Sequence, residues 1–211
     1  MSDAVNPLEE TGECAPLPGR VVVLWVALLS AAVALTLGAG AQSHDYATPF
    51  ALPLAYESLV VCEAFAMLVL VPALAPGAPW ITYALLWVLA APAAVVTAWA
   101  SDCTVGALLG SQGHVALVAV LSWGWMRLLR ASRAVWWVAM GALGFGCPFV
   151  AFAAGDALRQ DLGWLYAFSP FWLAARLSQG WEGGGIAIAA LAGTLLVALA
   201  PWLVSPKGPR A

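Results

Sequence analysis

Charged residues are scarce in this chain of 211 residues, and their scarcity excludes several classes of protein. It carries 8 Lys and Arg against 11 Asp and Glu, so charged residues make up 9% of the sequence. A soluble domain has about 25% charged residues, which excludes an ordinary soluble protein with a single core. A net charge of −3 also leaves no basic footprint for DNA or RNA, so no nucleic-acid partner is expected.

Residues that build metal, haem and redox centres are also few. The four cysteines have no C-x-x-C spacing, and the two histidines, His44 and His114, fall on separate predicted elements. Neither a metal site nor a bis-histidine haem site is therefore expected. The only lysine, Lys207, lies outside every apolar stretch, which excludes a retinal Schiff base. With no Ser/His/Asp arrangement at helical spacing either, we expect no cofactor and no enzymatic activity.

Apolar residues are abundant instead. They make up 63% of the chain, the mean hydropathy is +0.90, and there are 12 Trp, many near the ends of apolar runs, as in the aromatic belts of membrane proteins. Six stretches reach the roughly 20 residues that a membrane-spanning helix needs. The sequence therefore predicts an all-α, polytopic integral membrane protein with six transmembrane helices. The six stretches are approximately Val21–Ala41, Pro53–Leu74, Pro79–Ala100, Cys103–Trp125, Ala134–Ala154 and Gly185–Val204.

The linkers between these stretches are too short for a separate soluble domain. We expect an acidic cytoplasmic tail over residues 1–19, one six-helix transmembrane domain over residues 20–205, and a short cytoplasmic tail over residues 206–211. A signal peptide cleaved near Ala39-Gly40-Ala41 is the alternative for the first stretch. The region before it is acidic and the apolar run is long for a signal, which favours a retained span.

Basic residues predict the orientation. Arg127, Arg130 and Arg133 form the only basic cluster, between the fourth and fifth stretches, and cytoplasmic loops attract Lys and Arg. With that loop inside, both termini are also inside, and six basic residues lie inside against two outside. We therefore expect a multi-pass protein of the inner (plasma) membrane with a cytoplasmic N-terminus and a cytoplasmic C-terminus.

Residues 156–184 are neither a span nor a polar loop. Asp156 is expected to cap a short helix that ends before Ser169-Pro170, and this pair in turn suits the start of a second short helix. Arg176 near its end and Gly180 after it are typical of a helix C-terminus. The pattern predicts a helical hairpin on the outer side, either re-entrant or lying flat on the membrane surface.

The topology and one motif carry a family resemblance. The stretch Tyr166-Ala167-Phe168-Ser169-Pro170-Phe171-Trp172-Leu173 is similar to the Ser-Pro stretch found after the fifth span of ABC-2 type permeases. Six spans, both termini inside and a short helical pair before the last span also resemble that family. The resemblance implies a permease that moves a small or lipid-like substrate outward. It also implies an outer re-entrant hairpin with four residues at its break: Ser169, Pro170, Phe171 and Trp172.

The resemblance also implies partners. No Walker A pattern is present, so a separate ATPase subunit would supply ATP hydrolysis, and a second permease copy would complete the pathway within the membrane lipid. The loop Ala75-Pro76-Gly77-Ala78 carries no charge. Coupling to the ATPase would therefore fall to Arg127, Arg130 and Arg133.

Two other functions fit the same composition. The chain could be a non-catalytic integral subunit of a larger membrane complex, which the sparse polar residues inside the spans favour. It could also be the substrate-binding membrane subunit of an energy-coupled importer, which the charge-poor loops fit.

Two ionisable residues fall deep within predicted spans. Glu63 lies about 15 Å along the second stretch and His114 about 16 Å along the fourth, both counted from the outer side at about 1.5 Å per residue. Their similar depth allows a Glu63–His114 contact inside the bundle. Such a pair either orients two helices through one buried hydrogen bond or serves a proton or a substrate path, because intramembrane ionisable groups tend to be functional. An intramembrane enzyme built on them is a more distant alternative.

Overall fold

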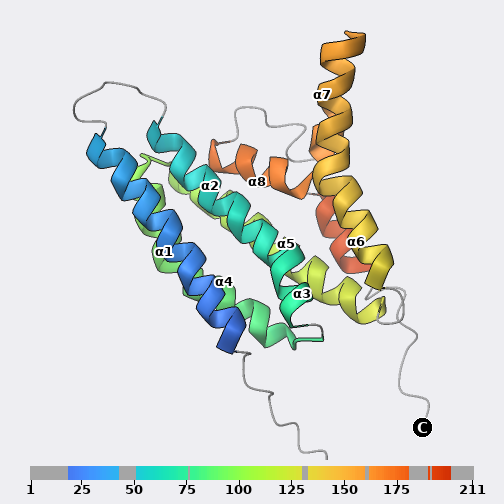
Figure 1. Ribbon diagram of the computed structural model, residues 1–211, viewed down its shortest axis with the longest axis horizontal. Coiled ribbons are helices and arrows are strands. Elements are labelled where there is room, and N and C mark those ends of the chain that lie inside the picture. Colours follow the sequence, from blue (N-terminus) through green and yellow to red (C-terminus); the bar gives the residue numbers. More distant parts are fainter. Residues whose placement is uncertain are drawn as a thin grey trace, which may run out of the picture.

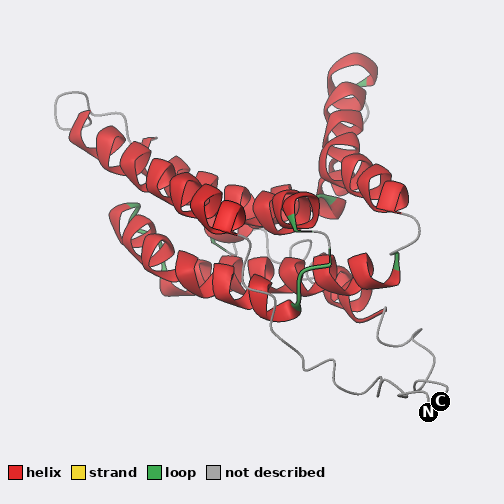
Figure 2. Ribbon diagram, turned by 60° about the horizontal axis from the view of Figure 1, so that its bottom comes forward, coloured by secondary structure: helices red, strands yellow, loops and turns green. Residues whose placement is uncertain are grey.

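The structure of the chain is a computed structural model that describes residues 19–42, 51–75, 77–129, 133–159, 162–180, 190 and 192–200. Within these ranges the secondary structure is entirely helical, as predicted, and no strand occurs (Figure 2). The predicted acidic tail, apart from Gly19, and the C-terminal tail fall outside the described residues. The elements are α1 (Gly19–Gln42), α2 (Ala51–Phe65), η1 (Ala66–Leu70), α3 (Val71–Leu74), α4 (Trp80–Ala100), α5 (Val105–Leu128), α6 (Arg133–Gly141), η2 (Ala142–Gly146), α7 (Cys147–Leu158), η3 (Gly163–Phe168) and α8 (Pro170–Ser178).

Four helices in the described part of the chain are long and apolar enough to cross a membrane, which indicates a membrane-embedded protein. They correspond to the second, third, fourth and fifth predicted spans. For the first predicted span, α1 is helical from Gly19 to Gln42, and its apolar described part is Gly19–Ala34. For the sixth, residues 192–200 are helical, and residues 181–189 lie outside the description. The four helices are Tyr56–Leu74, Trp80–Ala100, Val105–Arg127 and Ala134–Ala157.

Two of these long helices contain a π-helical turn, η1 and η2, each followed by a proline. A proline has no amide hydrogen, so the carbonyl four residues before it loses its helical donor. Pro72 thereby frees the carbonyl of Leu68, and Pro148 frees the carbonyl of Gly144. A buried carbonyl without a donor is costly, so each must be bonded from elsewhere.

Both freed carbonyls accept a hydrogen bond from a side chain of a distant segment. The Trp136 indole of α6 donates to the Leu68 carbonyl at 3.3 Å, and the Ser169 hydroxyl donates to the Gly144 carbonyl at 3.0 Å. Trp136 is 2% exposed and Ser169 1% exposed, so water does not replace either bond. The prolines therefore create two acceptors through which separate parts of the chain are joined.

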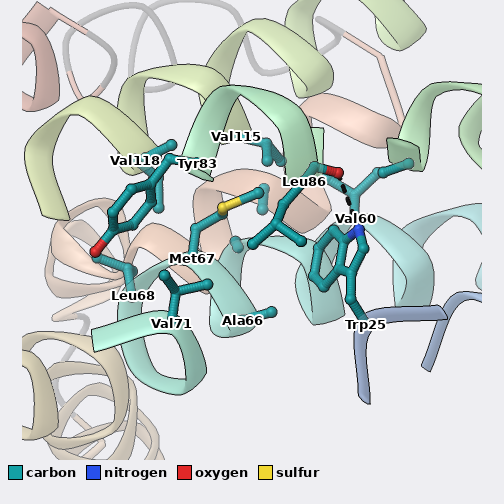
Figure 3. Packing of buried hydrophobic residues seen from close by; sticks show 14 of the residues in the cluster. Trp25, Val60, Ala66, Met67, Leu68, Val71, Tyr83, Leu86, Val115 and Val118 are labelled. Carbon is teal, nitrogen blue, oxygen red and sulfur yellow. Dashed lines mark hydrogen bonds between the residues drawn. The ribbon is translucent and has the colours of Figure 1, made fainter. Parts of the chain in front are cut away.

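The core lies among α1, α2, α4 and α5, which run side by side (Figure 1). Figure 3 shows Met67 and Val115 among the buried side chains of this core, with the Trp25 side chain at its edge. The Trp25 indole donates to the Leu86 carbonyl at 2.9 Å. The buried indole is thus hydrogen bonded, as a buried polar group must be. This bond and the apolar side chains around it hold α1 against α4.

The helix of α6, η2 and α7 stands apart from this core, and α7 projects away from it (Figure 1). Only 17% of an 18-residue apolar stretch within Ala134–Ala157 is buried inside the structure, against 50% of the corresponding stretch within Tyr56–Leu74. Its outward side chains include Phe149 and Phe152, which are 69% and 63% exposed. This helix therefore presents a long apolar face that the described chain does not cover.

The prediction for the first half of the hairpin was wrong. Asp156 lies in the last turn of α7 and caps no new helix, because α7 continues to Leu158 and ends at Arg159, whose φ of 51° is left-handed. A single helix-interior glycine such as Gly155 costs only about 1 kcal/mol, so it does not stop the helix. A short 3₁₀ segment, Gly163–Phe168, replaces the expected first half-helix.

The prediction for the second half was correct. Ser169 is the N-cap of α8 and Pro170 its first residue, while Arg176 lies in the last turn. Gly180 follows with a φ of +100°, a backbone conformation that glycine adopts without strain. Figure 1 shows α8 beside α2, and its contacts are chiefly with α2 and α5. Leu173, Ala174 and Leu177 of α8 are fully buried, and Leu173 and Leu177 pack with Trp172 and Ala190.

Replacing Trp136 by Phe should destabilise the protein, because it leaves the Leu68 carbonyl buried without a donor. Such a group costs about 1–3 kcal/mol, which should appear as a lower midpoint of thermal unfolding in detergent. Trp99→Phe is the matched control, since Trp99 is 84% exposed at the end of α4. Equal unfolding midpoints for the two variants would contradict this account of the π-helical turn.

Candidate functional site

The Ser169–Pro170 junction is the point at which α8 meets the rest of the bundle. Ser169 has an extended backbone, with φ −82° and ψ 117°, and its hydroxyl accepts from the Trp172 amide at 3.3 Å. The same hydroxyl donates to the Gly144 carbonyl. One side chain therefore both caps α8 and bonds it to η2, which uses the donor and the acceptor capacity of a serine hydroxyl together.

Phe171 follows directly and packs into the same junction. A Cβ on Gly144 would lie 2.6 Å from Cε2 of Phe171, closer than side chains approach one another. The Phe171 ring also lies 6.0 Å from the ring of Phe65 and 5.3 Å from that of Phe145, centroid to centroid. Glycine at position 144 is thus what lets the aromatic ring of α8 reach the backbone of η2.

The far end of α8 is bonded to α2 through polar side chains. The Gln179 amide donates to the Glu57 carboxylate at 2.7 Å, and Arg176 donates to the Gln179 side chain at 3.3 Å. The Arg176 guanidinium also lies over the Trp172 ring, 5.4 Å from its centroid, and Trp172 stacks on Tyr166 at 5.9 Å. These contacts complete the attachment of α8 along its whole length.

His114 is fully buried and contacts the start of α8. Its Nε2 lies 2.9 Å from the Pro170 carbonyl oxygen, and because a carbonyl only accepts, Nε2 carries the hydrogen. Nδ1 has no hydrogen-bond partner among the described residues. His114 therefore positions the first turn of α8 against α5 and retains one free acceptor.

Glu63 is also fully buried, and its partner is an amide. The Gln112 side chain donates to Oε2 of Glu63 at 2.7 Å and accepts from the Trp87 indole at 3.2 Å. In the part of the chain that the structure describes, Oε1 of Glu63 has no hydrogen-bond partner. A three-residue polar chain thus crosses from α2 through α5 to α4 in the middle of an apolar core.

Among the described residues, the hydrogen bonds of Glu63 and His114 go to other partners than the one the depth count suggested. Both residues are deep in the bundle as the depth count requires, but Glu63 bonds to Gln112 and His114 to Pro170. Residues two apart on a helix point in directions about 200° apart. Gln112 and His114 therefore face different neighbours, and Gln112 is the member that sequence reasoning missed. An amide in the middle of an apolar span was the signal that could have identified it.

An apolar cavity of about 480 Å³ lies against the junction. Pro170 forms part of its wall, and Thr194 is the one polar side chain among its lining residues. The walls come from α5, α6, η2, η3 and the last described segment, and include Leu121, Met140, Trp164, Phe168, Ala190, Gly193 and Val197. A space with these walls suits an apolar ligand or an acyl chain rather than an ion.

The basic loop lies away from this junction, at the end of α5. The Arg127 guanidinium is exposed and lies 5.1 Å from the centroid of the Trp123 ring. Arg130 falls outside the described residues, and Arg133 is described only as the first residue of α6. The coupling role predicted for the three arginines remains a prediction.

Cysteines build no cluster in the described ranges. Cys62, Cys103 and Cys147 are free thiols, each half-buried, and no group of three potential metal ligands occurs among the residues searched. Burial raises the pKa of the Cys103 thiol, which lies in the turn between α4 and α5 and is 3.5 Å from the Ser178 carbonyl. Cys103 therefore holds α8 near this turn as a weak donor.

Comparisons with protein families, with curated proteins and with solved structures gave no match. The fold defines a helical membrane protein, and the candidate site is the Ser169–Pro170 junction with the buried polar residues around it.

Ser169→Ala should lower stability, because it removes both the cap of α8 and the donor to the Gly144 carbonyl. We expect a loss of about 1–3 kcal/mol in the free energy of unfolding, measured by denaturation in mixed micelles. Ser101→Ala is the control, since the Ser101 hydroxyl has no hydrogen-bond partner. Comparable losses of stability in the two variants would show that the hydrogen bonds of Ser169 do not stabilise the protein.

Double-mutant cycles should separate the two buried polar contacts. Glu63→Ala combined with Gln112→Ala should show a coupling energy above about 0.5 kcal/mol, since the two side chains are hydrogen bonded. Glu63→Ala combined with His114→Ala should be additive within about 0.5 kcal/mol. The reverse result, coupling to His114 and additivity with Gln112, would restore the pair expected from depth alone.

Proposed function

We propose that this protein is the membrane-spanning permease subunit of a transporter, of ABC-2 type. It moves a small or lipid-like substrate and works with a separate ATPase subunit. The observation that carries the proposal is the packing of α8, a short helix that begins at Ser169-Pro170 and is buried against α2 and α5. A buried short helix between long apolar helices is what a re-entrant segment requires.

The depth of the junction supports re-entry over a position flat on the surface. His114, which bonds to Pro170, lies nine residues after Val105, or about 14 Å along α5. Gly144, which bonds to Ser169, lies about 16 Å from the Arg133 end of its helix and about 21 Å from the Leu158 end. Partners that lie this far inside the long helices favour a chain break within the bilayer.

Six spans and the orientation belong to the same proposal. Helical residues 19–42 and 192–200 supply candidates for the first and last spans beside the four longer apolar helices. With Arg127 and its neighbouring arginines in the cytoplasm, both termini are cytoplasmic, the membrane is the plasma membrane, and the Ser169–Pro170 break opens toward the outer side.

The cavity beside Pro170 supports the choice of substrate. Its walls are almost wholly apolar and its volume of about 480 Å³ accommodates a small amphiphile or part of an acyl chain. Because η3 and α8 form one side of it, a shift of the junction would change its shape. That arrangement favours a lipid-like substrate over an ion.

The uncovered face of α6 and α7 supports a protein partner. The apolar stretch of Ala134–Ala157 is 17% buried, whereas that of Tyr56–Leu74 in the same bundle is 50% buried. The difference leaves apolar surface on α6 and α7 for a second permease copy. The same face favours the second candidate function, a non-catalytic subunit of a larger membrane complex. The third, a substrate-binding subunit of an energy-coupled importer, draws its support from the cavity alone.

Pro170→Ala tests the permease proposal. The substitution restores a backbone donor and relaxes the conformation of Ser169, so the break before α8 should weaken. We expect substrate transport and substrate-stimulated ATP hydrolysis of the purified complex to fall at least several-fold, with the protein still folded. Pro92→Ala is the control, because Pro92 is an exposed proline inside α4.

Purification from native membranes in mild detergent supplies the complex for this test. A co-purifying chain with a Walker A motif is the result expected for the permease. Recovery with an integral membrane complex that lacks any ATPase would overturn the proposal in favour of the non-catalytic subunit. Equal transport by the Pro170→Ala and Pro92→Ala variants would show that the Ser169–Pro170 junction takes no part in transport.

A further inference from the structure

A second apolar space lies on the opposite side of α5 from α8, between α4 and α5. It is a groove of about 400 Å³ with Tyr83 and Trp87 on one wall and Ala116 and Trp123 on the other. Trp80 and Trp87 are seven residues apart on α4, so the groove extends for about 10 Å along the helix. An extended acyl chain has the width and the apolar surface that such a groove accommodates.

The groove adjoins a smaller pocket at the end of the bundle that carries the basic loop. This pocket, of about 300 Å³, shares Tyr83 and Trp123 with the groove. Its remaining walls include Gly77 from the turn after α3 and Arg127 from the last turn of α5. The apolar groove and the cationic side chain of Arg127 are therefore separated by little more than the Trp123 ring, whose centroid lies 5.1 Å from the guanidinium.

The charge at this end is uncompensated in the described structure. Among the described residues no carboxylate is paired with Arg127, whose guanidinium is held over the Trp123 ring at 5.1 Å. The sequence places Arg130 and Arg133 close behind it, so three arginines fall within seven residues. A concentration of basic residues at the membrane end of two helices attracts anionic headgroups.

The end of the groove away from the basic loop is lined by Trp87 and Ala116. Trp87 forms its inner wall and donates its indole hydrogen to Gln112, which in turn donates to Glu63. The polar groups of Trp87, Gln112 and Glu63 therefore face one another rather than the groove. The groove has one apolar end inside the bundle and one cationic end at its edge, which is the polarity of a phospholipid.

We propose that an anionic phospholipid binds here, with one acyl chain in the groove between α4 and α5 and its phosphate at Arg127. The occupant is a membrane lipid rather than a free phosphate, because the groove adjoining Arg127 is apolar and opens along the membrane-spanning part of the helices. The site is separate from the cavity beside Pro170 and does not depend on the transport function proposed above.

Native mass spectrometry of the full-length protein in mild detergent tests the site. The protein is titrated with phosphatidylglycerol or phosphatidylcholine of identical acyl chains, and retained lipid is counted. We expect phosphatidylglycerol to be retained about fivefold more tightly, the preference that one arginine near a headgroup confers. Arg127→Gln should remove this preference, and Arg127→Lys should keep most of it.

Arg176→Gln is the matched control. Arg176 lies over Trp172 as Arg127 lies over Trp123, but it belongs to α8 and not to this groove. It should leave the lipid preference unchanged. Ala116→Phe should weaken retention of both lipids by filling the groove, and if that variant fails to fold, Val120→Trp at the 41% exposed edge of the groove replaces it.

Three results would overturn the proposal. They are equal retention of the two lipids by the native protein, an unchanged preference in Arg127→Gln, and unchanged retention when the groove is filled. Displacement of the bound lipid by glycerol phosphate at the same concentration would also overturn it, because a ligand without acyl chains would then account for the site.

Discussion

The structure depends on a constraint that the membrane imposes on the backbone: a carbonyl freed inside an apolar helix must be bonded by a side chain. Pro148 frees the carbonyl of Gly144, and the hydroxyl of Ser169 bonds to it. The same hydroxyl caps α8. Pro148 lacks the amide hydrogen that would bond to the Gly144 carbonyl, and Ser169 at the start of α8 supplies a hydrogen in its place. Without the proline, that carbonyl would not be a free acceptor. Pro72 and Trp136 repeat this arrangement at the Leu68 carbonyl.

The remaining buried polar groups extend the same principle. His114 bonds to the Pro170 carbonyl, and Glu63 to Gln112, so each of the two deep ionisable residues has one partner supplied by a neighbouring helix. Each also keeps one atom that no described residue bonds, Oε1 of Glu63 and Nδ1 of His114. Buried acceptors left open are rare in proteins, and here both lie within the helices that surround α8.

Apolar surface is distributed unevenly over the bundle, and this distribution separates its two sides. The α6–α7 helix offers a broad uncovered face suited to another protein, whereas α4 and α5 enclose a narrow groove with a cationic end suited to a lipid. In a bilayer both kinds of surface are solvated by acyl chains, so shape and the placement of a single charge decide which partner is specific. The proposed transport pathway lies between them, beside α8.

The sequence alone determined the class of the protein, the positions of the long apolar helices and the start of α8. Length, apolar content and the local chemistry of Ser169-Pro170 act within a few residues, so no tertiary information is needed to interpret them. The partners of Glu63 and His114 and the continuation of α7 past Asp156 were decided by the tertiary structure. Depth along a helix follows from counting residues, but the direction a side chain faces depends on how each helix is rotated against its neighbours. That rotation is set by packing around residues such as Gly144 and Phe171, which lie far apart in the chain.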